Sequence, residues 1–85
     1  MAEFDIFFRA SVWKDVQKIP KKDMPNILSR INSLSGNPDP VGSEKITGQE
    51  RYRLRQGKYC IVYSVQGNGL TVWVVRAGHR KDVYR

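Results

Sequence analysis

The last 35 residues contain three strand-like segments in immediate succession, and this arrangement restricts the possible folds more than any other feature of the sequence. Residues 52–56 alternate apolar and basic side chains, and residues 59–65 and 70–76 are rich in β-branched and aromatic residues. Gly57-Lys58 separates the first two segments, and Gly67-Asn68-Gly69 supplies the positive φ angles of a tight turn between the second and third. The three segments are therefore predicted to form an antiparallel sheet.

The N-terminal part of the chain predicts a strand and then a helix. Residues 3–9 alternate Phe4, Ile6 and Phe8 with other side chains, which is typical of a half-buried strand that joins the later sheet. Ser11 is a good N-cap for the helix. The expected buried stripe of this helix is Val12, Trp13, Val16 and Ile19, and the expected water-facing residues are Lys14, Asp15, Gln17 and Lys18. Trp13 is accordingly predicted to be a core residue and not a ligand platform.

A second helix is predicted between Pro20 and Gly36. Asp23 is its candidate N-cap, Pro25 is tolerable only in its first turn, and Gly36 suits a left-handed C-cap. Its apolar positions repeat the helical spacing at Ile27, Leu28, Ile31 and Leu34. The order strand, helix, helix, strands predicts one α+β domain over residues 1–85, with two helices packed on one face of a three- to four-stranded, mostly antiparallel sheet.

The net charge of +7 is confined to the same C-terminal stretch as the three strands. Residues 51–85 hold eight of the 15 Lys and Arg residues and a single acid, whereas the charges of residues 1–50 cancel. If Tyr52 and Leu54 face the helices, Arg53 and Arg55 point to the opposite, open face and give it a concave basic surface. Such a surface is the expected footprint for the phosphates of RNA or DNA. The alternative is a solvated sheet face without a ligand.

Composition narrows the class of protein. With 40% hydrophobic and 27% charged residues, the chain is neither disordered nor membrane-spanning. No apolar run approaches the length of a transmembrane helix, and the start MAEFDIFF lacks the cationic region of a signal peptide. We therefore expect a cytoplasmic protein with no membrane partner. One Cys and one His exclude an internal disulfide and a four-ligand structural zinc site, and we expect no metal or other cofactor.

Two runs, YRLRQGKYCIVYSV and LTVWVVRAGHRKDVYR, resemble the RelE branch of the RelE/ParE toxin superfamily. The likeness covers essentially the whole chain, and the ending GHRKDVYR is its most specific part. The resemblance implies a RelE-like toxin of a type II toxin–antitoxin system, which cleaves messenger RNA (mRNA) in the A site of the 70S ribosome and is silenced by its cognate antitoxin. The lopsided charge of the chain would suit an acidic antitoxin that wraps the toxin and masks the basic face.

The resemblance also implies the residues of the site. Its catalytic positions fall on Arg53, Arg55, Arg80 and Tyr84. Where the family usually has an arginine after the first tyrosine of the middle strand, this chain has Cys60. Cys60 is interpreted either as an attenuating substitution, in which case arginine at this position would raise cleavage, or as a natural variant on a half-buried strand. The residues expected to bind RNA or the ribosome are Arg51, Lys58, His79, Lys81 and Arg85.

The implied endoribonuclease reaction is attack of a ribose 2′-hydroxyl on the adjacent phosphate, which leaves a 2′,3′-cyclic phosphate. It needs a proton acceptor, stabilisation of the phosphorane and a proton donor. Arginines supply the stabilisation because guanidinium groups pair with phosphate oxygens and stay charged. Tyr84 is the preferred proton-handling or base-stacking residue, while His79 either takes part or is a surface loop histidine. Two alternatives stay open: a ParE-like inhibitor of DNA gyrase, which usually lacks the paired basic strand, and a nucleic-acid-binding module without catalysis.

Overall fold

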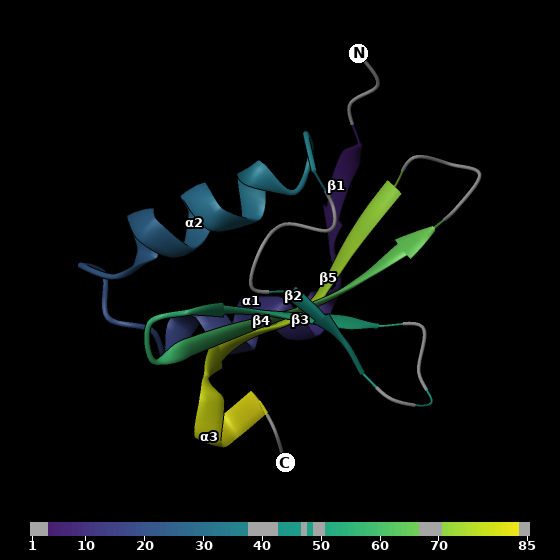
Figure 1. Cartoon of the computed structure of the whole chain (residues 1–85). Coiled ribbons are helices and arrows are strands. Elements are labelled where there is room, and N and C mark those ends of the chain that lie inside the picture. The colour runs from purple at the N-terminus through teal and green to yellow at the C-terminus, as the bar shows by residue number, and fades with distance from the viewer. Residues whose placement is uncertain (1–3, 38–42, 47, 49–50, 67–70, 84–85) are drawn as a thin grey trace.

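The computed structural model describes residues 4–37, 43–46, 48, 51–66 and 71–83, and in these it contains five strands and three helices (Figure 1). In chain order the elements are β1 (Asp5–Phe8), α1 (Ala10–Gln17), α2 (Met24–Ser33), β2 (Ser43–Lys45), β3 (Tyr52–Gln56), β4 (Tyr59–Gln66), β5 (Thr71–His79) and α3 (Arg80–Val83). The predicted α+β class is confirmed. The predicted number of strands is wrong, because the three residues of β2 are too few and too polar to show a pattern in the sequence.

The sheet has the strand order β1-β5-β4-β3-β2. The strands from β2 to β5 pair antiparallel, whereas β1 runs parallel to β5. Parallel strands need a long crossover connection, and the many residues between β1 and β5 provide one. Both predicted pairings of the C-terminal segments are confirmed, and Gly57 adopts a φ of 59° in the turn between β3 and β4. The predicted turn at Gly67-Asn68-Gly69 lies outside the described residues. β5 continues to His79, beyond its predicted end.

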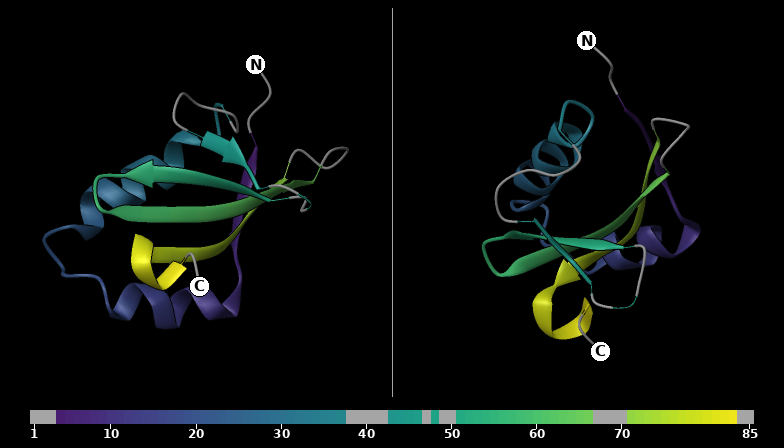
Figure 2. Two further views of the ribbon diagram at one scale, coloured as in Figure 1. Left: turned by 60° about the horizontal axis from the view of Figure 1, so that its bottom comes forward. Right: turned by 45° about the vertical axis from the view of Figure 1, so that its right-hand side comes forward.

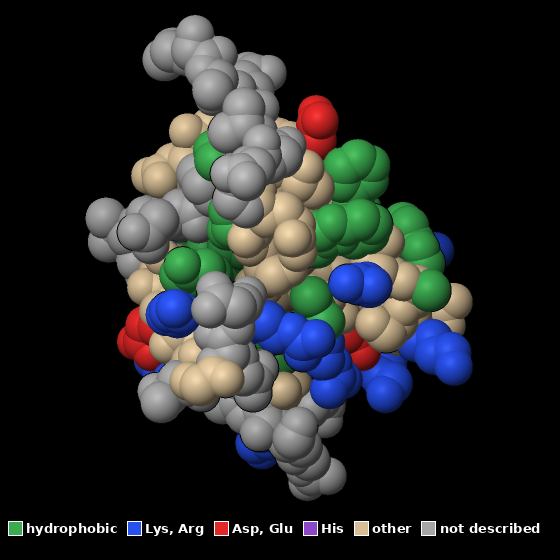
Figure 3. Space-filling view, turned by 90° about the vertical axis from the view of Figure 1, so that its right-hand side faces the viewer, with side chains coloured by type: hydrophobic (Ala, Val, Ile, Leu, Met, Phe, Trp, Pro, Cys, Tyr) green, Lys and Arg blue, Asp and Glu red, His purple; other side chains and the backbone are tan. Residues whose placement is uncertain are grey.

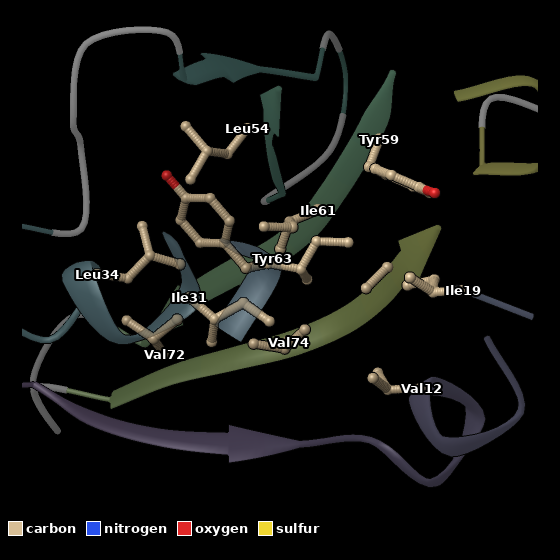
Figure 4. Packing of buried hydrophobic residues seen from close by; sticks show 12 residues of the cluster. Val12, Ile19, Ile31, Leu34, Leu54, Tyr59, Ile61, Tyr63, Val72 and Val74 are labelled. Carbon is tan, nitrogen blue, oxygen red and sulfur yellow. The ribbon is translucent and has the colours of Figure 1, made fainter. Parts of the chain in front are cut away.

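The hydrophobic core lies between one face of the sheet and the helices α1 and α2, so the prediction that both helices cover one face is confirmed (Figure 2). Figure 4 shows Tyr63 of β4 in the middle of this core, between Leu54 of β3 and the α2 residues Ile31 and Leu34. Tyr63 is fully buried, and its ring stacks on that of Tyr52 with 5.6 Å between centroids. Burial of these large side chains fixes which face of β3 and β4 turns inward.

α1 differs from its prediction in three ways. Arg9 and not Ser11 is the N-cap residue, because the Ser11 hydroxyl donates a hydrogen bond to the Val75 carbonyl of β5 at 3.1 Å. Trp13 is 58% exposed and lies against the ring of Phe8, so its predicted place in the core is wrong. Asp15 does not face water: its side chain is 11% exposed and contacts β5. These differences have one cause: α1 lies along the part of β5 that does not pair with β1.

α2 begins and ends near its predicted bounds, but the predicted left-handed C-cap at Gly36 is wrong, because the C-cap is Leu34 with a φ of −68° and Gly36 does not adopt a positive φ. Asp23 is the N-cap residue and Pro25 lies in the first turn, but the Asp23 carboxylate does not cap the helix. It instead accepts a hydrogen bond from the Tyr59 hydroxyl of β4. Three of the four predicted apolar positions are buried, whereas Leu28 is 44% exposed at the rim of the stripe.

α3 packs on the opposite side of the sheet from α2 (Figure 1). Among the described residues no helix is long and apolar enough to span a membrane, and no group of three or more His, Cys, Asp or Glu side chains is arranged to hold a metal ion.

Candidate functional site

The candidate site lies on the sheet surface opposite α1 and α2, which we call the outward face. Leu54 is fully buried on the helix side, and the alternation of β3 therefore turns Arg53 and Arg55 outward, as predicted. The strand register aligns the outward residues in rows across the sheet: Arg53, Val62 and Arg76 in one row, and Arg55, Cys60 and Gly78 in the next. Figure 3 shows Lys and Arg side chains gathered beside hydrophobic ones on one side of the molecule.

Two of the outward arginines are held by carboxylates. Arg53 donates from Nε and Nη2 to Oε2 of Glu44 on β2, at 3.3 and 3.1 Å. Glu44 can reach Arg53 because β2 places it directly opposite on the neighbouring strand. This ion pair is well exposed, with 35% of the Arg53 side chain and 56% of the Glu44 side chain accessible to solvent. Glu44 orients the Arg53 guanidinium and contributes little to folding stability.

Arg76 forms the second pair, with Asp15 of α1. Its Nε and Nη2 donate to the two Asp15 oxygens at 3.3 and 3.2 Å, and the backbone N–H of Ala77 donates to the same carboxylate at 3.2 Å. Asp15 thereby satisfies an N–H at the edge of β5 that has no strand partner. The carboxylate fixes both the guanidinium and the strand edge to α1.

Sequence reasoning did not assign a role to Arg76. In a regular strand it would lie on the same face as Val72 and Val74, which are fully buried against the helices. An irregularity between Val62 and Tyr63 shifts the β4–β5 register, so that Val62 faces Arg76 and Tyr63 faces Val74. The extra residue on β5 turns Arg76 out of the core, and its guanidinium reaches past the edge of β5 to Asp15 of α1. No signal in the sequence marks this bulge.

The outward face is less open than predicted, because α3 covers part of it. Val83 of α3 packs on Cys60 and Val62, and all three are buried. Gly78 lies opposite Cys60, and α3 passes close to it: a Cβ added there would make an ordinary van der Waals contact with Cγ2 of Val83 at 3.6 Å. Cys60 is 0% exposed and not half-buried as predicted. An arginine at position 60 would have to extend through the space that Val83 fills, so the predicted gain in cleavage would come with displacement of α3.

Arg80 begins α3 at the end of the sheet where β3 turns into β4. Its backbone N–H donates to the Lys58 carbonyl at 3.1 Å, and its side chain is exposed. Lys81 is exposed as well. The fold therefore brings Arg80 to the end of β3 that carries Arg55. Arg51 is exposed at the start of the same strand, and Tyr84 and Arg85 lie outside the described residues.

His79 and Lys58 lie toward the other side of the sheet. His79 is the last residue of β5 and not a loop residue; it stands opposite Tyr59, whose ring it meets edge-on at 6.2 Å between centroids. Its Nδ1 accepts a hydrogen bond from the Lys81 N–H at 3.2 Å, which leaves the proton of the neutral imidazole on Nε2. The Lys58 ammonium lies 5.7 Å from the centre of the Tyr59 ring. Both residues therefore contact the Tyr59 ring.

Tyr59 itself is a packing residue with an anchored hydroxyl. The hydroxyl donates to Asp23 Oδ2 at 2.5 Å. This hydrogen bond to a carboxylate, together with burial and the negative charge of Asp23, raises the pKa of Tyr59 above its ordinary value. The phenol therefore stays protonated at neutral pH and ties β4 to the start of α2.

Comparison with known proteins identifies the family of this chain. Residues 6–84 match the family described as ParE toxin of type II toxin–antitoxin system, parDE. The chain belongs to this family. As a ParE-family toxin it is 26% identical over 86 residues to Toxin RelG of Mycobacterium tuberculosis, a match that spans 96% of this chain and 97% of the relative.

Solved structures of RelE toxins share the fold of this ParE-family toxin. The M. tuberculosis toxin–antitoxin complex RelBE2 matches with a TM-score of 0.82 at 20% identity, over 93% of this chain and 100% of the other. The RelB–RelE complex of Methanococcus jannaschii gives 0.74 at 28% identity, over 92% and 94%. The isolated E. coli RelE toxin gives 0.76 at 20% identity, over 98% and 92%. The resemblance to the RelE/ParE superfamily is thus confirmed.

Proposed function

We propose that this toxin is a ribosome-dependent endoribonuclease that cleaves mRNA in the ribosomal A site and so inhibits translation. The observation that carries the proposal is the outward position of Arg53 and Arg55 beside α3, which begins with Arg80. Three cations on one surface suit a chain of phosphates. Membership of a toxin family, together with the RelE toxins among its relatives, supports the same reading.

In the proposed mechanism the arginines stabilise charge. Arg53, Arg55 and Arg80 pair with the oxygens of the scissile phosphate as the 2′-hydroxyl attacks, and the barrier falls because their charge is already in position. Glu44 holds the Arg53 guanidinium in a defined orientation before substrate arrives. Tyr84 handles a proton or stacks on a base, and the ribosome aligns the 2′-hydroxyl with the phosphate. His79 supports the start of α3 by accepting a hydrogen bond from the Lys81 N–H.

The proposed regulator is a cognate antitoxin. Several of the similar solved structures are complexes of a toxin with its antitoxin, including RelBE2 of M. tuberculosis and RelB–RelE of M. jannaschii. We propose that an acidic segment of the antitoxin covers the basic outward face, since opposite charge speeds association and masks the arginines. The complete toxin would act in the cytoplasm, where ribosomes and mRNA are found.

Primer extension on a defined message tests the enzymatic role. The protein and its Arg80→Ala variant are added to a reconstituted translation system, with and without ribosomes. Cuts at codon positions should require ribosomes and fall by at least about a hundredfold in Arg80→Ala, as for loss of a group that stabilises transition-state charge. Lys22→Ala is the matched control, because it removes one exposed cation from the turn between α1 and α2. Equal cleavage by Arg80→Ala and the wild type would refute the assignment of Arg80.

The same wild-type and variant proteins also test two other functions. Inhibition of DNA gyrase is the second candidate, because the matching family is that of ParE toxins. Loss of DNA supercoiling by gyrase, with no cuts in any primer-extension lane, would establish it. A binding module without catalysis would show a different pattern: each loss of effect would follow a loss of ribosome affinity and of its salt dependence.

A further inference from the structure

An exposed aromatic pair occupies the outward face at the β1 edge of the sheet. Phe7 of β1 and Trp73 of β5 face each other across the parallel ladder. Their rings stack with centroids 5.0 Å apart and planes inclined by 28°. Phe7 is 45% exposed, and Trp73 is partly exposed. The guanidinium carbon of Arg9 lies 5.0 Å from the centre of the Trp73 ring, so a cation sits over the aromatic surface.

This aromatic pair continues the surface that carries the arginines. Trp73 faces Ser64, and Ser64 is the next outward residue of β4 after Val62, which lies between Arg53 and Arg76. Two residues along a strand advance by about 6.6 Å. The arginine row and the aromatic row are therefore adjacent rows of the same sheet surface. Figure 3 shows hydrophobic and basic side chains next to each other on one side of the molecule.

We propose that Phe7 and Trp73 form a stacking site for a nucleobase of single-stranded RNA, with Arg9 pairing with the adjoining phosphate or closing over the base. The inference rests on the proposed function, in that it takes the outward face to meet RNA. Aromatic side chains interleaved with cations are the usual platform for single strands, because every base has a face that stacks. A purely apolar partner would cover the Arg9 guanidinium, which lies over the Trp73 ring, without supplying an anion, and this favours nucleic acid over a hydrophobic protein surface.

A second aromatic pair, of which Trp13 is exposed, provides an internal control. Trp13 and Phe8 lie 5.7 Å apart, inclined by 38°, and Phe8 packs against the core on the helix side of the sheet. The chain has two tryptophans, so Trp13→Phe leaves Trp73 as the single fluorescent reporter, and Trp73→Phe leaves Trp13. Each variant keeps an aromatic ring at the changed position.

The test is a fluorescence titration with two short RNA oligonucleotides of equal length, one of adenines and one of abasic residues. The adenine oligonucleotide should quench Trp73 in the Trp13→Phe protein and leave Trp13 nearly unchanged in the Trp73→Phe protein. In the Trp13→Phe background, Phe7→Leu should weaken binding of the adenine oligonucleotide about tenfold, with little effect on the abasic one. In competition with a labelled oligonucleotide, Trp73→Leu should weaken binding similarly and Trp73→Phe should retain it.

The outcomes separate this inference from the proposed enzymatic function. Equal quenching by the adenine and abasic oligonucleotides, or equal affinity of Trp73→Leu and the wild type, would overturn the stacking site even if mRNA cleavage is normal. Base-dependent quenching in a protein that makes no cuts would support the stacking site and count against the nuclease. Quenching of Trp73 by an acidic peptide but not by RNA would assign the aromatic pair to a protein partner and refute the inference.

Discussion

Replacement of Asp15 should destabilise the domain more than its place on an outer helix suggests. The carboxylate accepts three hydrogen bonds, two from Arg76 and one from the Ala77 N–H, and its side chain is only 11% exposed. Asp15→Ala leaves the Ala77 N–H without its partner, at about 1–2 kcal/mol. It also loses the ion pair, worth about 0.5–1 kcal/mol after solvent screening, because 38% of the Arg76 side chain is exposed. We expect a total loss of about 1.5–3 kcal/mol.

Urea unfolding measures this loss. Asp15→Ala should lower the urea midpoint at an unchanged slope. The midpoint of Asp15→Asn should lie between those of Asp15→Ala and the wild type, because asparagine keeps an acceptor for the Ala77 N–H. The matched control is Glu44→Ala, which removes a carboxylate at a similar distance from Arg53 but with 56% of its side chain exposed. Its expected cost is below about 1 kcal/mol. Equal losses for Asp15→Ala and Glu44→Ala would refute the argument that Asp15 seals the edge of β5.

Two further predictions concern the ends of the sheet. Tyr59→Phe removes the hydrogen bond to Asp23 and should lower the urea midpoint. Because folding raises the pKa of Tyr59, the difference in stability between the wild type and this variant should be constant below about pH 10 and shrink as the pH rises further. A midpoint difference that grows with alkaline pH would contradict this sign. Val83→Ala should let a thiol reagent reach Cys60 several times faster than in the wild type, because Val83 covers the buried thiol. Equal labelling rates would show that α3 does not protect it.

Local patterns predicted much of the fold. β3, β4 and β5 follow one another through short connections, so alternation and turn residues suffice to pair them. Trp13 was misassigned because it is next to Val12 on the helix, and its ring finds a partner in Phe8 at the rim of the core. The strand β2 has three polar residues and exists only because β3 offers it a partner. In both cases a contact between elements, and not the local pattern, decided the outcome.

In the candidate site, too, local patterns predicted some features and not others. The outward direction of Arg53 and Arg55 follows from simple alternation around Leu54. The outward position of Arg76 depends on a bulge, and the burial of Cys60 depends on a helix that folds back over the sheet. Neither leaves a local pattern in the sequence. The roles of the arginines, of Tyr84 and of His79 stay predictions.

The parallel pairing of β1 with β5 also governs how the domain folds. Asp15 and Arg76 are 61 positions apart, and Asp5 stands opposite Thr71 in the ladder. The β3–β4 and β4–β5 hairpins close short loops and can form quickly, whereas β1 gains its partner only through a loop that spans most of the chain. During synthesis β1 has no strand partner until β5 has emerged. β1 is therefore synthesised well before its partner strand, and the sheet can be completed only after β5 has emerged.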